Sequence, residues 1–276
     1  GFVHLHCHST FSFYAGVDGI EELVGQAKAL KMSALALTDT DSMSGLIKFY
    51  LVCKKEGIKP ILGTELTAPQ TPGENLVLLA RDEEGYRDIC EIITRKHLQP
   101  ESFSLENTLN RPWPHLFFIT AFPSLLKMAA RTPNHSRLYG ELINQCRDSR
   151  RRSRQLENLA KQLGIPLTAT NNVYFRTPGD REIHRVLRSI GLLTTVSRLR
   201  PREHAPAGAF FASFEEMQKR FPRHSQALRN SGRIDPEALE DYLAFGGYEG
   251  LSKALTTMQP AEVIDLIRRA LQGETF

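Results

Sequence analysis

Short apolar runs with the composition of β-strands alternate with amphipathic helical stretches along most of this chain. The predicted strands are residues 2–6, 34–37, 59–63, 75–80, 116–120, 138–142 and 166–170. The predicted helices are residues 20–31, a helix through 47–51 that ends before Gly57, and then 83–96, 154–163 and 180–190. Repeated strand–helix units of this kind are typical of an α/β fold with a parallel sheet.

The first predicted strand carries alternating histidines, in Val3-His4-Leu5-His6-Cys7-His8-Ser9. Side chains two residues apart on a strand share a face and lie about 7 Å apart, so we expect His4 and His6 to be able to share a metal ion. A single His-x-His pattern is a weak signal, however, and most such pairs bind no metal.

Polar residues follow several of the predicted strands. Asp39 comes after the strand 34–37, Glu65 after 59–63, and Asn171 with Asn172 after 166–170. In a parallel α/β barrel the carboxyl ends of the strands line one mouth, where these side chains would converge. The alternative is that they form turns and cap helices, which Asp and Asn often do at such points.

Length and composition indicate a soluble globular protein. The 276 residues allow one large α/β domain, or a domain of about 200 residues with an appendage. No apolar run is long enough to cross a bilayer, so we expect a cytoplasmic protein that contacts no membrane. Its cysteines are far apart and lack Cys-x-x-Cys spacing, which predicts reduced thiols rather than disulfides or a zinc knuckle; they are Cys7, Cys53, Cys90 and Cys146.

The formal charge of +4 is small, but the basic residues are concentrated in two places. Five arginines lie between residues 147 and 154, at Arg147, Arg150, Arg151, Arg152 and Arg154. A second basic group lies near residues 198–204, with Arg223 further on. Such a run is usually a solvated helix face, but it is also suited to phosphate, so Arg150, Arg151, Arg152 and Arg154 are candidate nucleic-acid contacts.

Three motifs in order carry a family resemblance. Residues 3–12 are followed by Ala34-Leu35-Ala36-Leu37-Thr38-Asp39 and by Gly57-Ile58-Lys59-Pro60-Ile61-Leu62-Gly63-Thr64-Glu65. Together they resemble the polymerase and histidinol phosphatase (PHP) domain, in the branch found in bacterial DNA polymerase III alpha subunits and their error-prone relatives. Segments 76–86, 169–174 and 210–217 extend the resemblance over residues 1–230. It implies an α/β fold: a distorted parallel, TIM-like (β/α)7 barrel.

The resemblance also implies a metal site, because active members of the family hold several ions for phosphoester hydrolysis. His4, His6 and Glu65 match ligand positions, and Asp39 is a further candidate. Other ligand positions carry residues that bind metal poorly or not at all: Ala15, Thr40, Asn75, Phe122, Asn172 and Tyr174. We therefore expect that the chain is no multinuclear phosphoesterase, and that at most one zinc or manganese ion remains.

Three functions follow as hypotheses. The first is a structural and interaction module of a DNA polymerase that contacts the palm and fingers, a proofreading exonuclease subunit, and DNA; the parent enzyme would use magnesium. Thr40 and Asp41 and the short loop before Asn75 favour an error-prone branch. The second is a metal-dependent phosphoesterase or 3′–5′ exonuclease that uses His4, His6 and Glu65, with Asp39 or His8. The third is a fragment of a redox complex.

The redox hypothesis depends on the end of the chain alone. Residues 234–242, 246–251, 253–255 and 258–267 are similar to the N-terminal flank of the NADH-binding, flavin-containing subunit of complex I and related hydrogenases. The Gly-rich nucleotide loop of that family is absent, so we expect no NADH or flavin in this chain. The expected domains are a barrel over 1–195, an exit segment over 196–231 and a helical tail over 232–276.

Overall fold

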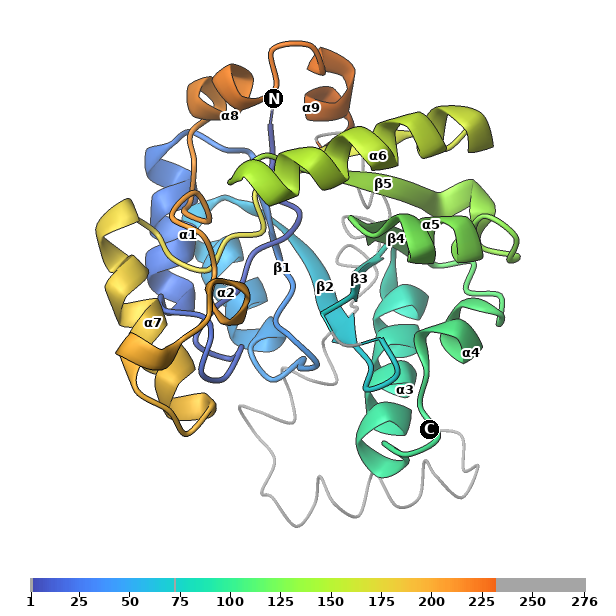
Figure 1. Ribbon diagram of the computed structural model, residues 1–276, viewed down its shortest axis with the longest axis horizontal. Helices are drawn as coiled ribbons and strands as arrows, with labels where there is room; N and C mark the ends of the chain where they lie inside the picture. Colours follow the sequence, from blue (N-terminus) through green and yellow to red (C-terminus); the bar gives the residue numbers. More distant parts are fainter. Residues whose placement is uncertain (1, 72, 232–276) are drawn as a thin grey trace. The chain divides into compact units, whose positions relative to one another are not determined.

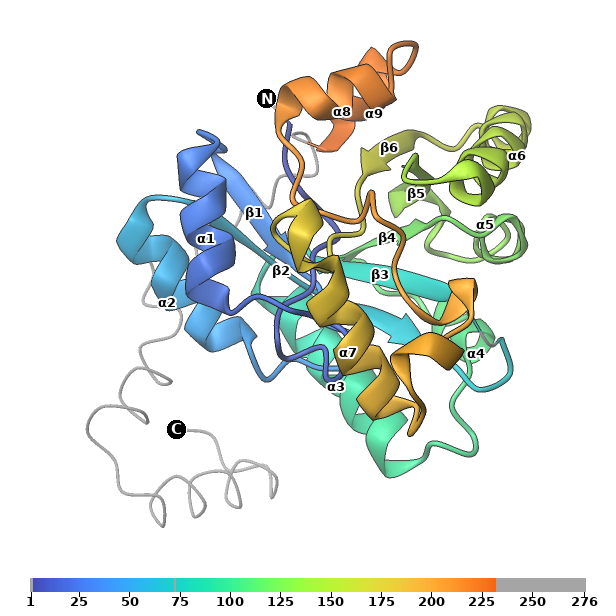
Figure 2. The same cartoon turned by 60° about the vertical axis from the view of Figure 1, so that its left-hand side comes forward.

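A six-stranded sheet in the order β1-β2-β3-β4-β5-β6 forms the centre of the fold (Figure 1). The structure is a computed structural model, and it describes residues 2–71 and 73–231. The strands are β1 (Ala34–Leu37), β2 (Lys59–Thr67), β3 (Asn75–Ala80), β4 (Leu116–Thr120), β5 (Leu138–Ile143) and β6 (Leu167–Thr170). The sheet curls into a half-barrel (Figure 2). The predicted α/β class with a distorted, barrel-like sheet is confirmed.

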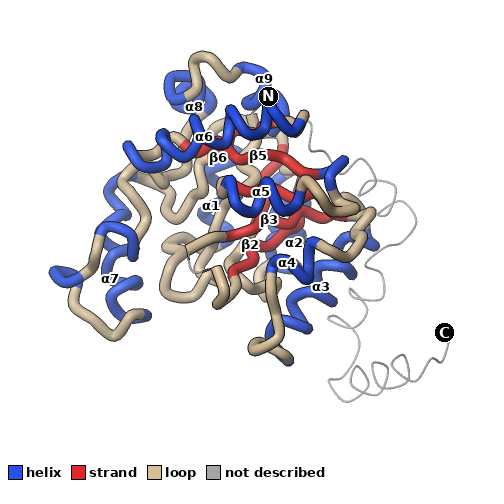
Figure 3. The backbone as a smooth tube through the Cα atoms, turned by 45° about the vertical axis from the view of Figure 1, so that its right-hand side comes forward, coloured by secondary structure: helices blue, strands red, loops and turns tan. Residues whose placement is uncertain are grey.

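Helices surround the strands, as Figure 3 shows. They are α1 (Ile20–Ala29), α2 (Leu46–Glu56), α3 (Glu83–Leu98), α4 (Leu105–Leu109), α5 (Pro123–Ala129), α6 (Arg147–Leu163), α7 (Arg181–Gly191), α8 (Phe214–Arg220) and α9 (Ser225–Ser231). Short 3-10 turns occupy His135–Arg137, Pro178–Asp180, Val196–Arg198 and Pro201–Glu203. Gly57 ends α2 and Gly164 ends α6, each in the left-handed conformation that favours glycine.

The sheet is not parallel throughout. β1 and β2 are parallel, as are β4, β5 and β6, but β3 is antiparallel to both of its neighbours. The reason lies in the connection between β2 and β3, which spans only residues 68–74. A parallel pair needs a crossover of a dozen or more residues, whereas an antiparallel pair can be joined by a short turn. The expectation of parallel strands is therefore corrected at β3.

The N-terminal segment is extended but is not a regular strand, because the backbone bends at Leu5 and His6. Its backbone nevertheless forms hydrogen bonds with residues at both edges of the sheet. On the β1 side, the carbonyls of His4 and Cys7 accept from the amides of Ala36 and Thr38 at 2.9 Å each. On the β6 side, the His6 carbonyl accepts from the amide of Val173 at 2.9 Å. The segment thus bridges the two edge strands and completes the curl of the sheet.

A buried apolar cluster packs where this segment meets the sheet. It joins the N-terminal segment to the first four strands, through Val3, Leu5, Ala34, Ala36, Ile61, Val77, Leu79 and Ile119. Because Val3 and Leu5 belong to this core, the odd-numbered side chains of the segment anchor it against the strands. This packing holds the intervening histidines in fixed positions.

The segment after the barrel is partly helical and well packed. The side chains of Phe211 and Met217 are buried, and Phe210 pairs with Phe175 in a short parallel bridge. All four cysteines are free, as expected. Within the described residues, no helix combines the length and the apolar character that a bilayer span requires. The predicted tail over 232–276 lies outside the described residues.

Candidate metal site

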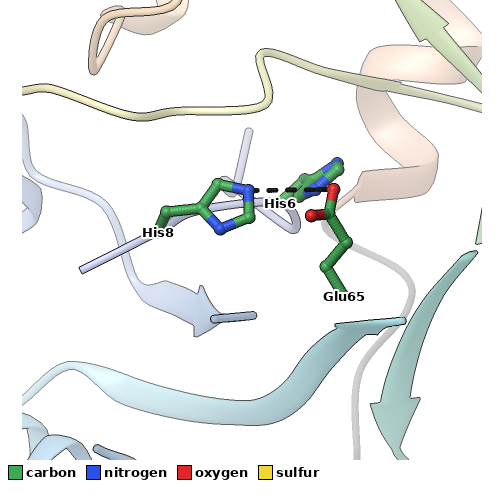
Figure 4. A group of neighbouring side chains, drawn as sticks. All are labelled: His6, His8 and Glu65. Carbon is green, nitrogen blue, oxygen red and sulfur yellow. Dashed lines mark hydrogen bonds and ion pairs between the residues drawn. The ribbon is translucent and has the colours of Figure 1, made fainter. Parts of the chain in front are cut away.

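Three buried side chains converge where the N-terminal segment meets β2 (Figure 4). One ligand atom from each of His6, His8 and Glu65 lies within 4.8 Å of the others. Glu65 Oε2 lies 3.0 Å from His6 Nε2 and 3.9 Å from His8 Nε2. All three residues are at most 3% exposed. The structure therefore brings together two of the residues predicted as ligands, His6 and Glu65, and with them His8, which the phosphoesterase hypothesis offered as an alternative to Asp39.

His6 is held between two carboxylates. Its Nε2 faces Glu65, and its Nδ1 donates to Oε1 of Glu141 at 2.7 Å. Burial disfavours a charge on the imidazole, but the negative charge of Glu141 and the hydrogen bonds that the ring donates to both carboxylates outweigh burial and raise the pKa of His6 to about 10. The histidine is therefore a cation whose ring orientation is fixed from both sides.

Glu141 is a member of this buried polar group that the sequence analysis missed. It lies in β5, is fully buried, and also accepts from the Thr170 hydroxyl at 2.5 Å. Its second oxygen, Oε2, is buried and has no hydrogen-bond partner in the described part of the chain. The signal that the sequence offered was a single glutamate in a predicted strand that is otherwise without charge.

His8 is enclosed by residues at two of the substituted ligand positions. Its Nε2 lies 3.1 Å from Oδ1 of Asn172, and its ring stacks on Tyr174 at 4.3 Å between centroids. Its Nδ1 lies 3.0 Å from the Ser12 hydroxyl. Burial lowers the pKa of His8 to about 4, so this ring is neutral at neutral pH. Burial also raises the pKa of Tyr174 well above its usual value, which keeps the phenol protonated.

Glu65 receives hydrogen bonds from two further substituted positions. Thr40 donates its hydroxyl to Oε1 at 2.9 Å, and Asn75 donates its amide to Oε2. Burial would raise the pKa of this carboxyl, but the neighbouring imidazoles of His8 and His6 lower it to about 2. Glu65 is therefore ionised, and both of its oxygens are already paired.

His4 lies outside this group. Its ring packs on Phe2 and Phe211, and its Nε2 lies 2.9 Å from the carbonyl oxygen of Ala212. The expectation that His4 and His6 share a face is therefore wrong. The alternation of a regular strand is broken by the bends at Leu5 and His6. His4 faces the exit segment, while His6 faces the strands.

Both carboxylate oxygens of Asp39 accept hydrogen bonds from a loop of the N-terminal segment. Its Oδ1 accepts from the amide of Ser9 and the hydroxyl of Ser12, and its Oδ2 accepts from the hydroxyl of Ser9, each at 2.7 Å. The residue thus fixes the turn that follows His8, in agreement with the alternative that such residues form turns. It is not among the grouped ligand atoms.

The last two substituted positions contribute no ligand atom. Ala15 is buried, and its carbonyl lies 2.7 Å from Nδ1 of His184. Phe122 precedes α5, and its ring lies 4.5 Å from the guanidinium of Arg152.

The donor set fits one metal ion and not several. Two imidazoles and one carboxylate are the ligands of some single-zinc sites that keep a position open for water. Ligand atoms around tetrahedral zinc are about 3.4 Å apart, close to the spacing of the Glu65 oxygen from the two imidazoles. Among residues 2–71 and 73–231 no other group of histidine, cysteine and carboxylate atoms comes together in this way.

The predicted nucleic-acid contacts lie on α6, which begins at Arg147 rather than near Arg154 as expected. Arg150, Arg151 and Arg154 are exposed, as is Arg147, while Arg152 is half-buried against Phe122. These arginines are therefore on the surface and separate from the buried histidine group.

Comparison with known proteins identifies the class. The model of the PHP domain family matches residues 4–163, so the chain belongs to this family. The Error-prone DNA polymerase of Symbiobacterium thermophilum is 30% identical in an alignment 268 residues long, which covers 83% of this chain and 24% of that protein. The DNA polymerase III subunit alpha of Treponema pallidum is 28% identical in an alignment 266 residues long, which covers 84% of this chain and 23% of that protein.

The PHP domain of this chain is thus homologous to part of the DNA polymerase III alpha subunits. The chain spans about a quarter of the length of the curated relatives that it matches. Among solved structures, an amidohydrolase from Chromobacterium violaceum is similar, with 13% identity, a TM-score of 0.42, and coverage of 63% of this chain and 88% of that one.

Proposed function

We propose that this chain is a structural and interaction module of a bacterial DNA polymerase, and that its ancestral multinuclear metal site has been replaced by a hydrogen-bonded network. The family and the polymerase relatives support the first part. One observation carries the second: four of the six residues at the substituted positions hydrogen-bond to or pack against Glu65 or His8. Thr40 and Asn75 donate to Glu65, while Asn172 and Tyr174 contact His8.

This network provides partners for buried polar atoms that metal ions would otherwise coordinate. A buried carboxylate and buried imidazoles are costly unless each polar atom is paired. Metal ions would pair them by coordination, whereas here hydroxyl and amide groups pair them by hydrogen bonds. The barrel therefore keeps a closed polar centre without needing several cations.

Burial argues further against hydrolysis of a polymeric substrate. The three grouped residues are at most 3% exposed, so a phosphodiester cannot reach them without rearrangement of the loops that carry Asn172 and Thr40. A catalytic metal also needs an open position for water or substrate. A closed centre of this kind suits a scaffold better than an active site.

In this proposal the module braces the palm and fingers of a longer polymerase, which acts in the cytoplasm on primed DNA with magnesium. A proofreading exonuclease subunit is a second proposed partner. Large polymerase chains fold as several domains, and a barrel with a rigid core provides a surface against which the others can pack.

A second candidate function is a mononuclear metal-dependent phosphoesterase or 3′–5′ exonuclease. The convergence of His6, His8 and Glu65 favours it. In such a site His6 Nε2, His8 Nε2 and a Glu65 oxygen would hold one zinc or manganese ion, and Glu141 would orient His6. The ion would supply an activated water. Asn172 and Asn75 would have to release their hydrogen bonds first.

Hydrolysis assays separate the two functions. The purified chain is incubated with bis-p-nitrophenyl phosphate and with single-stranded DNA in the presence of manganese or zinc, next to His6→Ala. The structural proposal predicts the same background rate for both proteins. Hydrolysis by the unmodified chain that His6→Ala abolishes would establish the phosphoesterase function instead.

A further inference from the structure

The first two turns of α6 carry five arginines and a single aspartate, an unusual concentration of charge for the start of a helix. The amino end of a helix already has a partial positive charge, so cations there are unfavourable and are normally placed at the other end. The arrangement therefore opposes stability.

Asp148 is the one carboxylate in the first turn of α6, and it offsets only part of this unfavourable charge. Across residues 2–71 and 73–231, no carboxylate forms an ion pair with any of these arginines. Arg150 donates its Nε to Oδ1 of Asn144 at 2.6 Å, and Arg152 stacks on Phe122. Both contacts orient a guanidinium group, but neither neutralises its charge.

Helical periodicity gathers four of the arginines on one side. The face of α6 that packs on the sheet is marked by the buried residues Leu156 and Ala160, and by Ser153, which hydrogen-bonds the backbone carbonyl of Ile143 at 2.8 Å. At 100° per residue the other side holds Arg147, Arg150, Arg151 and Arg154 within an arc of about 100°. These four exposed side chains, here called the α6 arginine face, span about 10 Å along the helix.

The α6 arginine face adjoins the loop that covers the histidine group. Gln145, two residues before the helix, donates its side-chain amide to the backbone carbonyls of Asn171 and of Asn172, the latter at 3.2 Å. Asn172 is the residue that contacts His8. The arginines therefore lie at the same end of the barrel as the carboxyl ends of β5 and β6.

We propose that the α6 arginine face binds the phosphodiester backbone of DNA. This inference rests on the proposed polymerase function and names a partner of that module. Guanidinium groups pair with phosphate oxygens through two parallel hydrogen bonds, and a polyanion supplies the negative charge that the start of α6 lacks. An exposed face with no acidic partner in the described part of the chain, in a relative of DNA polymerases, suits a repeating phosphate backbone.

The test measures binding of a fluorescein-labelled 20-nucleotide single-stranded DNA to the full chain by anisotropy over a range of salt concentrations. The test variant replaces the face: Arg147→Gln, Arg150→Gln, Arg151→Gln and Arg154→Gln. The matched control removes the same charge from exposed lysines elsewhere: Lys54→Gln, Lys55→Gln, Lys161→Gln and Lys219→Gln. Circular dichroism establishes that all three proteins are folded.

We expect the test variant to bind DNA at least about tenfold more weakly at low salt. The slope of the logarithm of the binding constant against the logarithm of the salt concentration should become shallower by about 0.7 for each phosphate that the variant no longer neutralises. The control should retain most of the affinity. Equal weakening in both variants would show that only net charge matters, and would overturn the proposal. Tighter binding of polyglutamate than of DNA would assign the face to an acidic protein instead. Absence of DNA binding by the unmodified chain also overturns this inference, but leaves the hydrolysis test of the proposed function unaffected.

Discussion

Nδ1 of His6 lies 2.7 Å from Oε1 of Glu141, a residue 135 positions further along the chain. The contact joins the N-terminal segment to β5 across the interior of the half-barrel. A second carboxylate, Glu65, lies 3.0 Å from the other ring nitrogen. This imidazole between two buried carboxylates is the centre of the polar network, so changes to its members should alter both stability and its dependence on pH.

Replacement of Glu141 should destabilise the fold. Glu141→Ala removes one partner of a buried charged pair, and the histidine that remains cannot reach water. Changes of this kind typically cost about 3–5 kcal/mol. Urea unfolding followed by circular dichroism measures the decrease, with Glu84→Ala on the exposed side of α3 as the control. A decrease from Glu141→Ala no larger than that of the control would contradict the account.

A conservative substitution of Glu141 should change how the stability of the fold depends on alkaline pH. Because the pKa of His6 is raised to about 10 from a usual 6.5, its contribution to stability is complete below pH 6.5 and disappears as the pH rises through 10. Glu141→Gln removes the carboxylate that raises this pKa most, so the alkaline decrease in stability should begin at a lower pH. Unfolding free energies between pH 7 and pH 10 test this expectation. Identical alkaline profiles for the two proteins would be evidence against it.

Three other histidines should make the fold less stable in acid, because their pKa values are lowered in the folded state. Burial is the main cause that lowers the pKa of His4, His8 and His184 to about 4 from a usual 6.5. The unfolded chain therefore binds protons below pH 6.5 that the folded chain accepts only below about pH 4. The free energy of unfolding should fall over this interval, by up to about 1.4 kcal/mol per pH unit for each histidine. Constant stability between pH 6.5 and 4 would refute this assignment.

The contribution of each hydrogen bond of this network to the stability of the fold should be measurable separately. Asn75 donates to Glu65 from the edge of the network, so Asn75→Ala leaves a buried carboxylate oxygen with one partner fewer. The expected cost is about 1–3 kcal/mol. Added zinc should recover part of it if the ion takes the place of the amide. Thermal melts of both proteins with and without zinc provide the comparison, and an unchanged melting temperature in Asn75→Ala would count against a network of this kind.

The start of α6 should gain stability when its charge is removed. Arg147→Gln relieves a cation in the first turn, at the positive end of the helix, with an expected gain of about 0.3 kcal/mol at low salt. Lys161→Gln removes a favourable cation from the last turn and should lower stability by a similar amount. Melting temperatures at low and high salt measure both effects, and the difference should shrink as salt is added. Lower stability of Arg147→Gln at low salt would contradict the expectation.

Much of the fold could be predicted from the sequence because its periodicities are strong. The strand over 116–120 and the start of the helix at Ile20 agree with the structure residue for residue. The first half of α6 was missed because its buried face begins with serines, which hydrogen-bond the backbone and give no apolar signal. The antiparallel direction of β3 was missed because an apolar run does not show which way its strand points.

The candidate site could be predicted only in part. His6 and Glu65 converge as expected, and the substituted positions surround them. Bends at Leu5 and His6 separate His4 from the group, and a local bend leaves no mark in a pattern of alternating residues. Glu141 could not be found from its own neighbourhood, because its partner lies far away in sequence and only the folded sheet brings them together.

Metal stoichiometry tests the central claim most directly. The full chain is purified without added metal, dialysed with an excess of zinc or manganese, freed of unbound ions and analysed by mass spectrometry of the elements, next to His6→Ala and His4→Ala. The account predicts at most one ion for each chain, absent from His6→Ala and retained in His4→Ala. Two or three ions for each chain, together with hydrolysis of a phosphoester, would contradict the claim that the multinuclear site has been replaced.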